Sequence, residues 1–150
     1  MLFYVDEFPE ARHHRQESEL LFPHVRRCAP ELAPVIDRLE ADHAQGEQAI
    51  RALEHALLAF EVMGEPRRAA FEQAVEHYIR FYLQHMATEE HEVLPAARRS
   101  LGPADWAELD AAFAAHRDPL TGHQADAAYE PLFRRILSTL PAPLGLGAVR

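Results

Sequence analysis

The chain has 150 residues, enough to bury the core of one domain, and a formal net charge of −9, which disfavours a nucleic-acid partner. Its one cysteine, Cys28, excludes an intramolecular disulfide and a thiolate zinc site, and is typical of a reducing compartment. No apolar run is long enough to span a membrane and no signal-peptide pattern opens the sequence, so we expect no membrane partner and a cytoplasmic location.

Proline and glycine divide the chain into helical blocks, and alternating strand-like runs are nearly absent, so we predict an all-α fold. The blocks that we expect to be helical cover roughly residues 1–27, 34–62 and 66–100, a shorter stretch starting near 103, and 127–140. We expect a single helical domain over residues 1–140 and a tail over 141–150.

The second block carries the clearest periodicity in the chain. Residues at alternating steps of three and four form a stripe of the kind that faces the core of a helix bundle. His43 interrupts this stripe, and Gly46 clears space one turn later. A buried imidazole needs a partner, so His43 is either a core histidine bonded to a neighbour or a ligand. The stripe consists of Ile36, Leu39, His43, Gly46, Ile50, Leu53, Leu57 and Phe60.

One sequence motif, the repeated phrase, occurs twice. It reads "HHRQESELLFPHVRR" in the first block and "HMATEEHEVLPAARR" in the third. Both follow the template His-x-x-x-Glu-x-x-x-apolar-apolar-Pro-x-x-Arg-Arg, which begins at His13 and again at His85. Residues four apart lie on the same face of a helix, so His13 and Glu17 point at one spot. His85 and Glu89 do the same on the core face of the third block.

These pairs have a metal interpretation and a surface interpretation. Two such helices facing each other, with His43 between them, would gather imidazoles and carboxylates, and such a set without thiolate suits iron, manganese or zinc. A lone His-x-x-x-Glu pair is commonly a surface pair, and a third copy begins at His43. Burying Glu17 and Glu89 together without a cation would, however, be costly or force protonation, which favours the metal interpretation.

The chain resembles the hemerythrin-like family, also called the HHE cation-binding domain, over most of residues 8–120. The resemblance rests on the two copies of the repeated phrase and on the segments "LEADHAQGEQAI" and "DWAELDAAFAAHRDPL". The resemblance implies an up-and-down four-helix bundle around a non-heme di-iron centre that keeps room for dioxygen, peroxide or nitric oxide. In the implied arrangement both glutamates bridge the irons, His43 and His85 cap one iron, and His13 caps the other. The residues that the resemblance makes ligands are His13, Glu17, His43, His85 and Glu89.

The family's first helix, with its own histidine, precedes the segment with which this chain starts. We therefore expect an N-terminally truncated bundle with extra short C-terminal helices. A second copy of the chain would supply the missing helix in a homodimer, since a three-helix layer exposes an apolar seam. The C-terminal helix around Tyr129 to Leu137 is another substitute, and His24 or His116 another ligand. Five ligands would hold the second iron poorly, so we expect partial occupancy.

Other polar residues on these helices have two interpretations each. Tyr78 and Tyr82 share the core face of the third block, where they pack with satisfied hydroxyls or hydrogen-bond an iron-bound oxygen species. Asp42 either orients an imidazole or belongs to a solvated face. His14 and Glu90 point about 100° away from the ligands, so we expect them to face solvent or lie behind the ligands. The histidines that we expect at the surface are His55, His77, His91 and His123.

The favoured function is that of a binding protein, a non-heme iron domain that binds or senses dioxygen, nitric oxide or related oxidants without necessarily turning over a substrate. An enzymatic alternative would use the same site for peroxide reduction, iron oxidation or iron delivery to damaged clusters. The sequence shows no reactive cysteine motif and no substrate channel to support it. A third alternative is a metal-free helical interaction module, and zinc or manganese remain open in place of iron.

Overall fold

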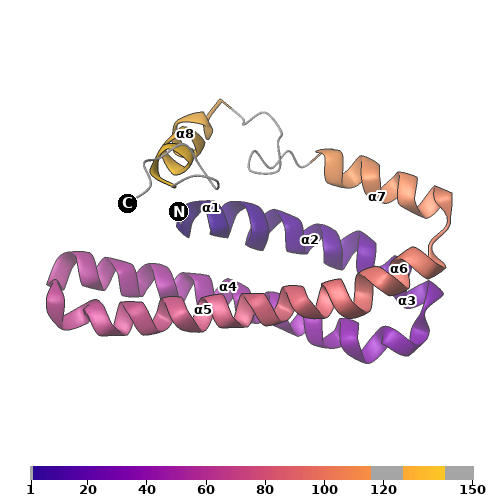
Figure 1. The fold of residues 1–150 in the computed structure, drawn as a ribbon, viewed down its shortest axis with the longest axis horizontal. Coiled ribbons are helices and arrows are strands. Elements are labelled where there is room, and N and C mark those ends of the chain that lie inside the picture. The colour runs from indigo at the N-terminus through magenta and orange to yellow at the C-terminus, as the bar shows by residue number, and fades with distance from the viewer. Residues whose placement is uncertain (1, 116–126, 141–150) are drawn as a thin grey trace.

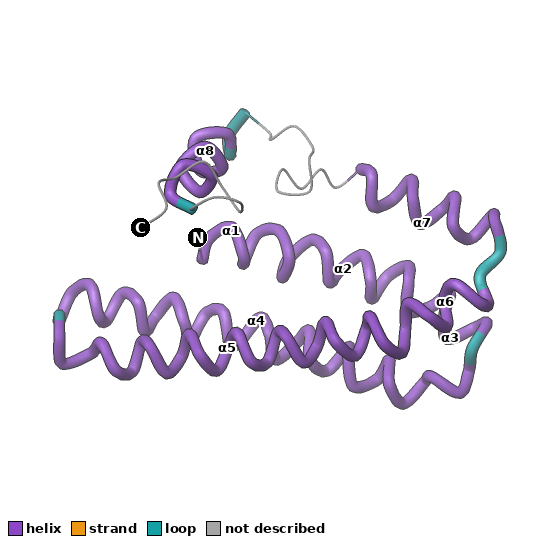
Figure 2. Tube along the Cα trace, in the orientation of Figure 1, coloured by secondary structure: helices purple, strands orange, loops and turns teal. Residues whose placement is uncertain are grey.

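The computed structural model describes residues 2–115 and 127–140, and every regular element within those ranges is helical (Figure 2). The predicted all-α fold is therefore confirmed. Within the same ranges, no helix is both long enough and apolar enough to cross a membrane. The tail expected over 141–150 lies outside the described residues, as do His116 and His123.

The first helical segment runs without interruption from Leu2 to Cys28 and alternates between α-helical and π-helical turns. Pro23 accounts for the second π-helical stretch: proline has no N–H for the carbonyl four residues back, and its ring would collide with that carbonyl in an α-helix. A π turn widens the helix at that point. The parts of the segment are α1 (Leu2–Val5), the π-helical η1 (Asp6–His13), α2 (His14–Gln16), the π-helical η2 (Glu17–Leu21) and α3 (Phe22–Cys28).

The second segment is one helix of 31 residues, α4 (Ala33–Met63), entered through the 3-10 turn η3 (Pro30–Leu32). Pro34 lies in its first turn, where a missing N–H costs no hydrogen bond. Gly64 ends the helix at a φ of 71°, a left-handed conformation that glycine adopts without a Cβ clash. Six of the eight residues of the predicted core stripe are buried, whereas Leu57 and Phe60 are partly exposed. The buried members are Ile36, Leu39, His43, Gly46, Ile50 and Leu53.

The third segment returns antiparallel to α4 after the 3-10 turn η4 (Glu65–Arg67), and the two form a long hairpin (Figure 1). Its parts are α5 (Arg68–Thr88), the π-helical η5 (Glu89–Val93) and α6 (Leu94–Ser100). Pro95 lies in the first turn of α6, directly after this π-helical turn. Both copies of the repeated phrase therefore place a π turn between their glutamate and their proline.

Two short helices follow, α7 (Pro103–Ala115) and α8 (Glu130–Thr139), and both lie beside the first segment (Figure 1). On α7, the backbone carbonyl of Ala112 accepts a hydrogen bond from Gln16 Nε2 at 2.7 Å. On α8, Phe133 packs against Tyr4 and Phe8. The C-terminal helix thus covers the start of the first segment without bringing a histidine.

The core of the three long segments is divided into two apolar clusters. Phe22, Ile36 and Leu39 belong to the cluster at one end, and Ile50 and Leu53 belong to the cluster at the other. On α4, the stretch between the two clusters is the one that carries the buried histidine of the stripe. The bundle therefore has a polar layer between its two apolar halves.

Candidate metal centre

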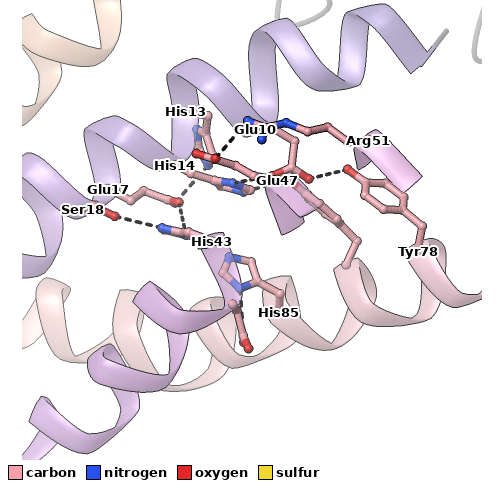
Figure 3. Close-up of polar contacts among 12 residues, drawn as sticks. Glu10, His13, His14, Glu17, Ser18, His43, Glu47, Arg51, Tyr78 and His85 are labelled. Atoms are coloured by element: carbon pink, nitrogen blue, oxygen red, sulfur yellow. Dashed lines mark hydrogen bonds and ion pairs between the residues drawn. The ribbon is translucent and has the colours of Figure 1, made fainter. Parts of the chain in front are cut away.

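The polar layer collects ionisable side chains from all three long segments (Figure 3). α4 contributes His43, α5 contributes His85, and the first segment contributes His14 and Glu17. Each of these residues offers one ligand atom, and the ligand atoms all lie within 4.8 Å of one another. None of the residues is more than 8% exposed. Imidazole nitrogens and a carboxylate oxygen at such separations are a donor set for a transition-metal ion.

Seven buried side-chain atoms of the described residues have no hydrogen-bond partner, and all of them belong to this layer. A buried polar atom without a partner costs about 1–3 kcal/mol, and folded proteins tolerate few of them. A cation would satisfy nitrogen and oxygen lone pairs together, so the residues present fit a metal ion. The atoms are Glu10 Oε2, His14 Nδ1, Glu17 Oε2, His43 Nε2, His85 Nδ1, His85 Nε2 and Glu89 Oε1.

Glu17 is held in its ionised form. Burial raises the pKa of its carboxyl group, but the neighbouring imidazoles of His13 and His43 outweigh burial and lower the pKa to about 2. Its Oε1 lies 2.9 Å from His13 Nε2, and its Oε2 lies 3.6 Å from His43 Nε2. The result is a buried carboxylate with one oxygen directed into the layer, as a metal ligand requires.

Contacts behind the imidazoles fix which ring nitrogen faces the layer. Ser18 Oγ lies 2.9 Å from His43 Nδ1, which leaves Nε2 of that ring toward the layer. Asp42 Oδ2 lies 3.6 Å from His85 Nδ1, and Glu89 Oε1 lies 3.3 Å from His85 Nε2. Burial lowers the pKa of His85, but Glu89 outweighs burial and the net shift is upward. Contacts of this kind orient metal-binding histidines in proteins.

Of the five residues that the sequence predicted as ligands, the structure places four in or beside the layer, namely Glu17, His43, His85 and Glu89. The fifth, His13, lies at the edge. Its side chain is 51% exposed, it touches Glu17 from outside, and its ring centroid lies 5.9 Å from that of Phe113 on α7.

His14 takes an inner position instead. Only 5% of this residue is exposed, so the expectation that it faces solvent is wrong, and its ligand atom lies among those of Glu17, His43 and His85. That expectation assumed the 100° per residue of an α-helix. The π-helical η1 precedes His14, and a π turn advances by a smaller angle per residue, so the inward face shifts along the sequence. The ring of His14 stacks on that of His43, with centroids 4.2 Å apart and planes 7° from parallel.

Glu10 is the buried acid that the sequence analysis missed. It is 3% exposed, and a Cβ added to Gly46 would lie 2.8 Å from its Oε2. Gly46 therefore makes room for Glu10, and not for His43 as expected. The signal available in the sequence was the four-residue spacing from Glu10 to His14, which repeats the ligand spacing in reverse order.

The two tyrosines on α5, Tyr78 and Tyr82, form hydrogen bonds with Glu10 and His14. Tyr78 donates its hydroxyl to Glu10 Oε1 at 2.6 Å, and the Tyr82 hydroxyl lies 2.8 Å from His14 Nε2. Burial, with the charge of Glu10, raises the pKa of both tyrosines, so they stay neutral. Of the two interpretations given to these tyrosines, the structure shows packing in the core with engaged hydroxyls.

The other candidate residues lie away from the layer. His24 Nδ1 is 3.1 Å from Asp105 Oδ1, near the start of α7, and it is not part of the cluster. Glu90 is exposed. His55, His77 and His91 are exposed too, as the sequence predicted.

Among the described residues, two cavities adjoin the layer. The first, of about 340 Å³, is lined by polar residues that include Glu10, His14 and Glu47. The second, of about 390 Å³, adjoins Glu17 and Glu89, and its other walls are mainly apolar. A cation and a small neutral molecule could thus each find a space next to the converging atoms.

A bundle of antiparallel helices in which buried imidazoles and carboxylates converge, with several of their nitrogen and oxygen atoms lacking hydrogen bonds, is typical of a helical metal-binding protein. The family model of the hemerythrin HHE cation-binding domain matches residues 1–97, and the chain belongs to this family. The matched segment contains the whole polar layer, whereas α7 and α8 lie beyond it. No match was found among curated proteins or among solved structures.

Proposed function

We propose that this chain is a cytoplasmic non-heme iron protein that binds or senses dioxygen, nitric oxide or a related oxidant. The observation that carries the proposal is the set of seven buried nitrogen and oxygen atoms that lack hydrogen-bond partners. Such a donor set without thiolate suits iron, manganese or zinc. Iron is the metal typical of the family to which the chain belongs.

The residues that would hold the metal are His14, Glu17, His43, His85 and Glu89, because their ligand atoms are buried and lie close together. Iron bound there would supply a redox-active Lewis acid. The protein supplies the ionised carboxylate of Glu17 and the imidazole of His43, whose ring is oriented by its contact with Ser18. The apolar clusters on both sides of the layer exclude water from it.

The apolar cavity supports a small oxidant as the ligand. It adjoins Glu17 and Glu89, and its walls include Leu21, Leu94 and Phe113. Dioxygen and nitric oxide are small and nearly nonpolar, so they enter such a space with little loss of hydration. A large polar substrate would lose more hydrogen bonds to water there than the mainly apolar walls could replace.

The first test replaces His85 by alanine. We expect His85→Ala to lose most of the bound metal while the helical content stays largely intact, because the substitution removes two unpartnered nitrogens from the core. Elemental analysis and circular dichroism measure the two quantities. His55→Ala, at an exposed position, is the control and should change neither. If His85→Ala keeps its full metal content, the ligand assignment is wrong.

A spectroscopic test separates binding from catalysis. A binding or sensing protein should change its visible absorbance reversibly when the iron-loaded form is exposed to dioxygen or nitric oxide, without sustained turnover. Continuous consumption of added peroxide would instead favour the enzymatic alternative. An absorbance that responds to neither ligand would exclude the proposed function even in a protein that binds iron.

A further inference from the structure

We propose that Glu10 is itself a metal ligand and that Glu10 and His14 form a second cation position beside the one made by Glu17, His43 and His85. This inference rests on the proposed function, since it assumes that the layer binds metal. Glu10 belongs to neither copy of the repeated phrase, and it is not among the ligands that the family resemblance implies.

Glu10 is buried, and only one of its two carboxylate oxygens has a hydrogen-bond partner. Its side chain is 1% exposed, and its Oε1 accepts the hydroxyl of Tyr78 at 2.6 Å. Its Oε2 has no hydrogen-bond partner, and neither does His14 Nδ1, which lies 3.2 Å away. A carboxylate oxygen and an imidazole nitrogen that face each other in this way are placed to share one ion.

Each of the two stacked imidazoles, His14 and His43, lies next to a carboxylate of its own. The rings of His14 and His43 lie nearly parallel with centroids 4.2 Å apart, and each ring has its own carboxylate. His14 faces Glu10 at 3.2 Å, whereas His43 faces Glu17 at 3.6 Å. The stack therefore divides the layer into two imidazole–carboxylate pairs, one for each cation (Figure 3).

Gly46 on α4 leaves room for the carboxylate of Glu10, which lies on the first segment. At Gly46, an added Cβ would lie 2.8 Å from Glu10 Oε2 and 3.2 Å from Oε1. Only glycine lets the carboxylate approach the backbone of α4 so closely. A glycine in the middle of a long helix lowers helix propensity, so its position against Glu10 points to a functional use of that space.

A polar cavity gives a hydrated ion access to Glu10 and His14. The cavity of about 340 Å³ is lined by Glu10, His14, Ser18 and His43, so it reaches both imidazole–carboxylate pairs. It is large enough for a metal ion with water ligands. Polar walls suit the entry of a cation, and a proposed metal site needs such a path.

The test is a metal titration of the apoprotein with Co²⁺, followed by its visible absorption bands and by elemental analysis. The wild-type chain should bind two equivalents. Glu10→Gln keeps the shape of the side chain but removes its charge, and it should retain the first equivalent and weaken the second at least tenfold. Gly46→Ala should do the same by displacing the carboxylate, while alanine favours the helix. Glu19→Gln, an exposed acid on the same segment, is the control.

The outcomes separate this inference from the proposed function. A wild-type chain that binds only one equivalent, or a Glu10→Gln variant that binds two with unchanged affinity, overturns the second position and leaves the proposed function standing. A wild-type chain that binds no metal overturns both. Loss of the second equivalent in Glu10→Gln and Gly46→Ala, with the Glu19→Gln control unchanged, supports the role of Glu10.

Discussion

His13 and His14 are neighbours in the sequence, but their side chains are 51% and 7% exposed. The repeated phrase selects His13 as the ligand, whereas the structure places His14 among the converging atoms. The difference arises from the π-helical turns on both sides of α2, which change the angle between successive side chains. Which of two adjacent histidines faces the core therefore depends on a backbone detail that α-helical periodicity does not reveal.

The two histidines give a prediction at the scale of single residues. We expect His14→Ala to weaken metal binding by about tenfold or more, and His13→Ala to weaken it less, because His13 lies at the exposed edge of the layer. Competition with a chelator of known affinity measures both variants. A larger loss in His13→Ala would show that the repeated phrase identifies the ligand better than the observed packing does.

Part of the site could be predicted from the sequence. His43 and His85 lie on α-helical stripes of three and four, so their burial followed from the periodicity. Glu10 could not be found in the same way, because it sits within the π-helical η1 and its partner Tyr78 is 68 positions away. The role of Gly46 was misjudged for the same reason, since the group that it accommodates lies on another segment.

At the scale of elements, the three long segments were predictable within a few residues because each carries a long amphipathic pattern. The position of α7 was not, because contacts between residues far apart in the sequence set it. Leu109 on α7 packs in the same apolar cluster as Phe22, and polar contacts join α7 to the first segment as well. Gln16 donates to the backbone of Ala112, and Arg27 Nη2 lies 2.6 Å from Asp105 Oδ1. Contacts of this kind join residues far apart in the sequence, so the spacing of apolar residues along one helix does not predict them.

Asp105 gives a prediction about the docking of α7. Its Oδ2 accepts the Gly102 backbone N–H at 2.9 Å, and this bond, with the charge of Arg27, lowers the pKa of Asp105. A carboxyl group whose pKa is lower in the folded than in the unfolded state stabilises the fold above its unfolded pKa, and this contribution is lost as the pH falls. We therefore expect Asp105→Asn to lower Tm at pH 7, and the difference to shrink below about pH 4.

Thermal unfolding across that pH range measures the effect of Asp105. Asp110→Asn is the matched control, because Asp110 is an exposed acid on the same helix. An equal Tm for Asp105→Asn and the wild type at pH 7 would mean that these polar contacts do not hold α7 in place.

Phe22 gives a prediction about the packing of α3 on its neighbours. It is fully buried in the apolar cluster shared with α4 and α6, and its ring stacks on His43 at a centroid distance of 5.5 Å. Phe22→Ala should lower the free energy of unfolding of the apoprotein by about 3–5 kcal/mol, measured by urea denaturation. Phe3→Ala, at a position that is 50% exposed, should change it by about 0.5 kcal/mol or less. Similar losses in both variants would contradict the assigned core.

At the scale of the whole molecule, the bundle and its central polar layer followed from the repeated phrase and the stripe on α4. The homodimer expected from the sequence stays a prediction. Ile79, Leu83 and Met86 recur on α5 at helical spacing and are 41–58% exposed, which leaves an apolar strip available to a second copy. Molecular mass in solution checks this expectation.

If the proposed function holds, bound cations stabilise the polar layer by satisfying its buried nitrogen and oxygen atoms. The most direct measurement is the iron content of the apoprotein after anaerobic reconstitution with Fe²⁺ and removal of unbound metal, together with its Tm before and after. We predict at least one tightly bound iron per chain and a Tm that rises on binding, because a ligand that binds only the folded state stabilises it. A folded, helical chain that retains no iron and shows an unchanged Tm would contradict the claim.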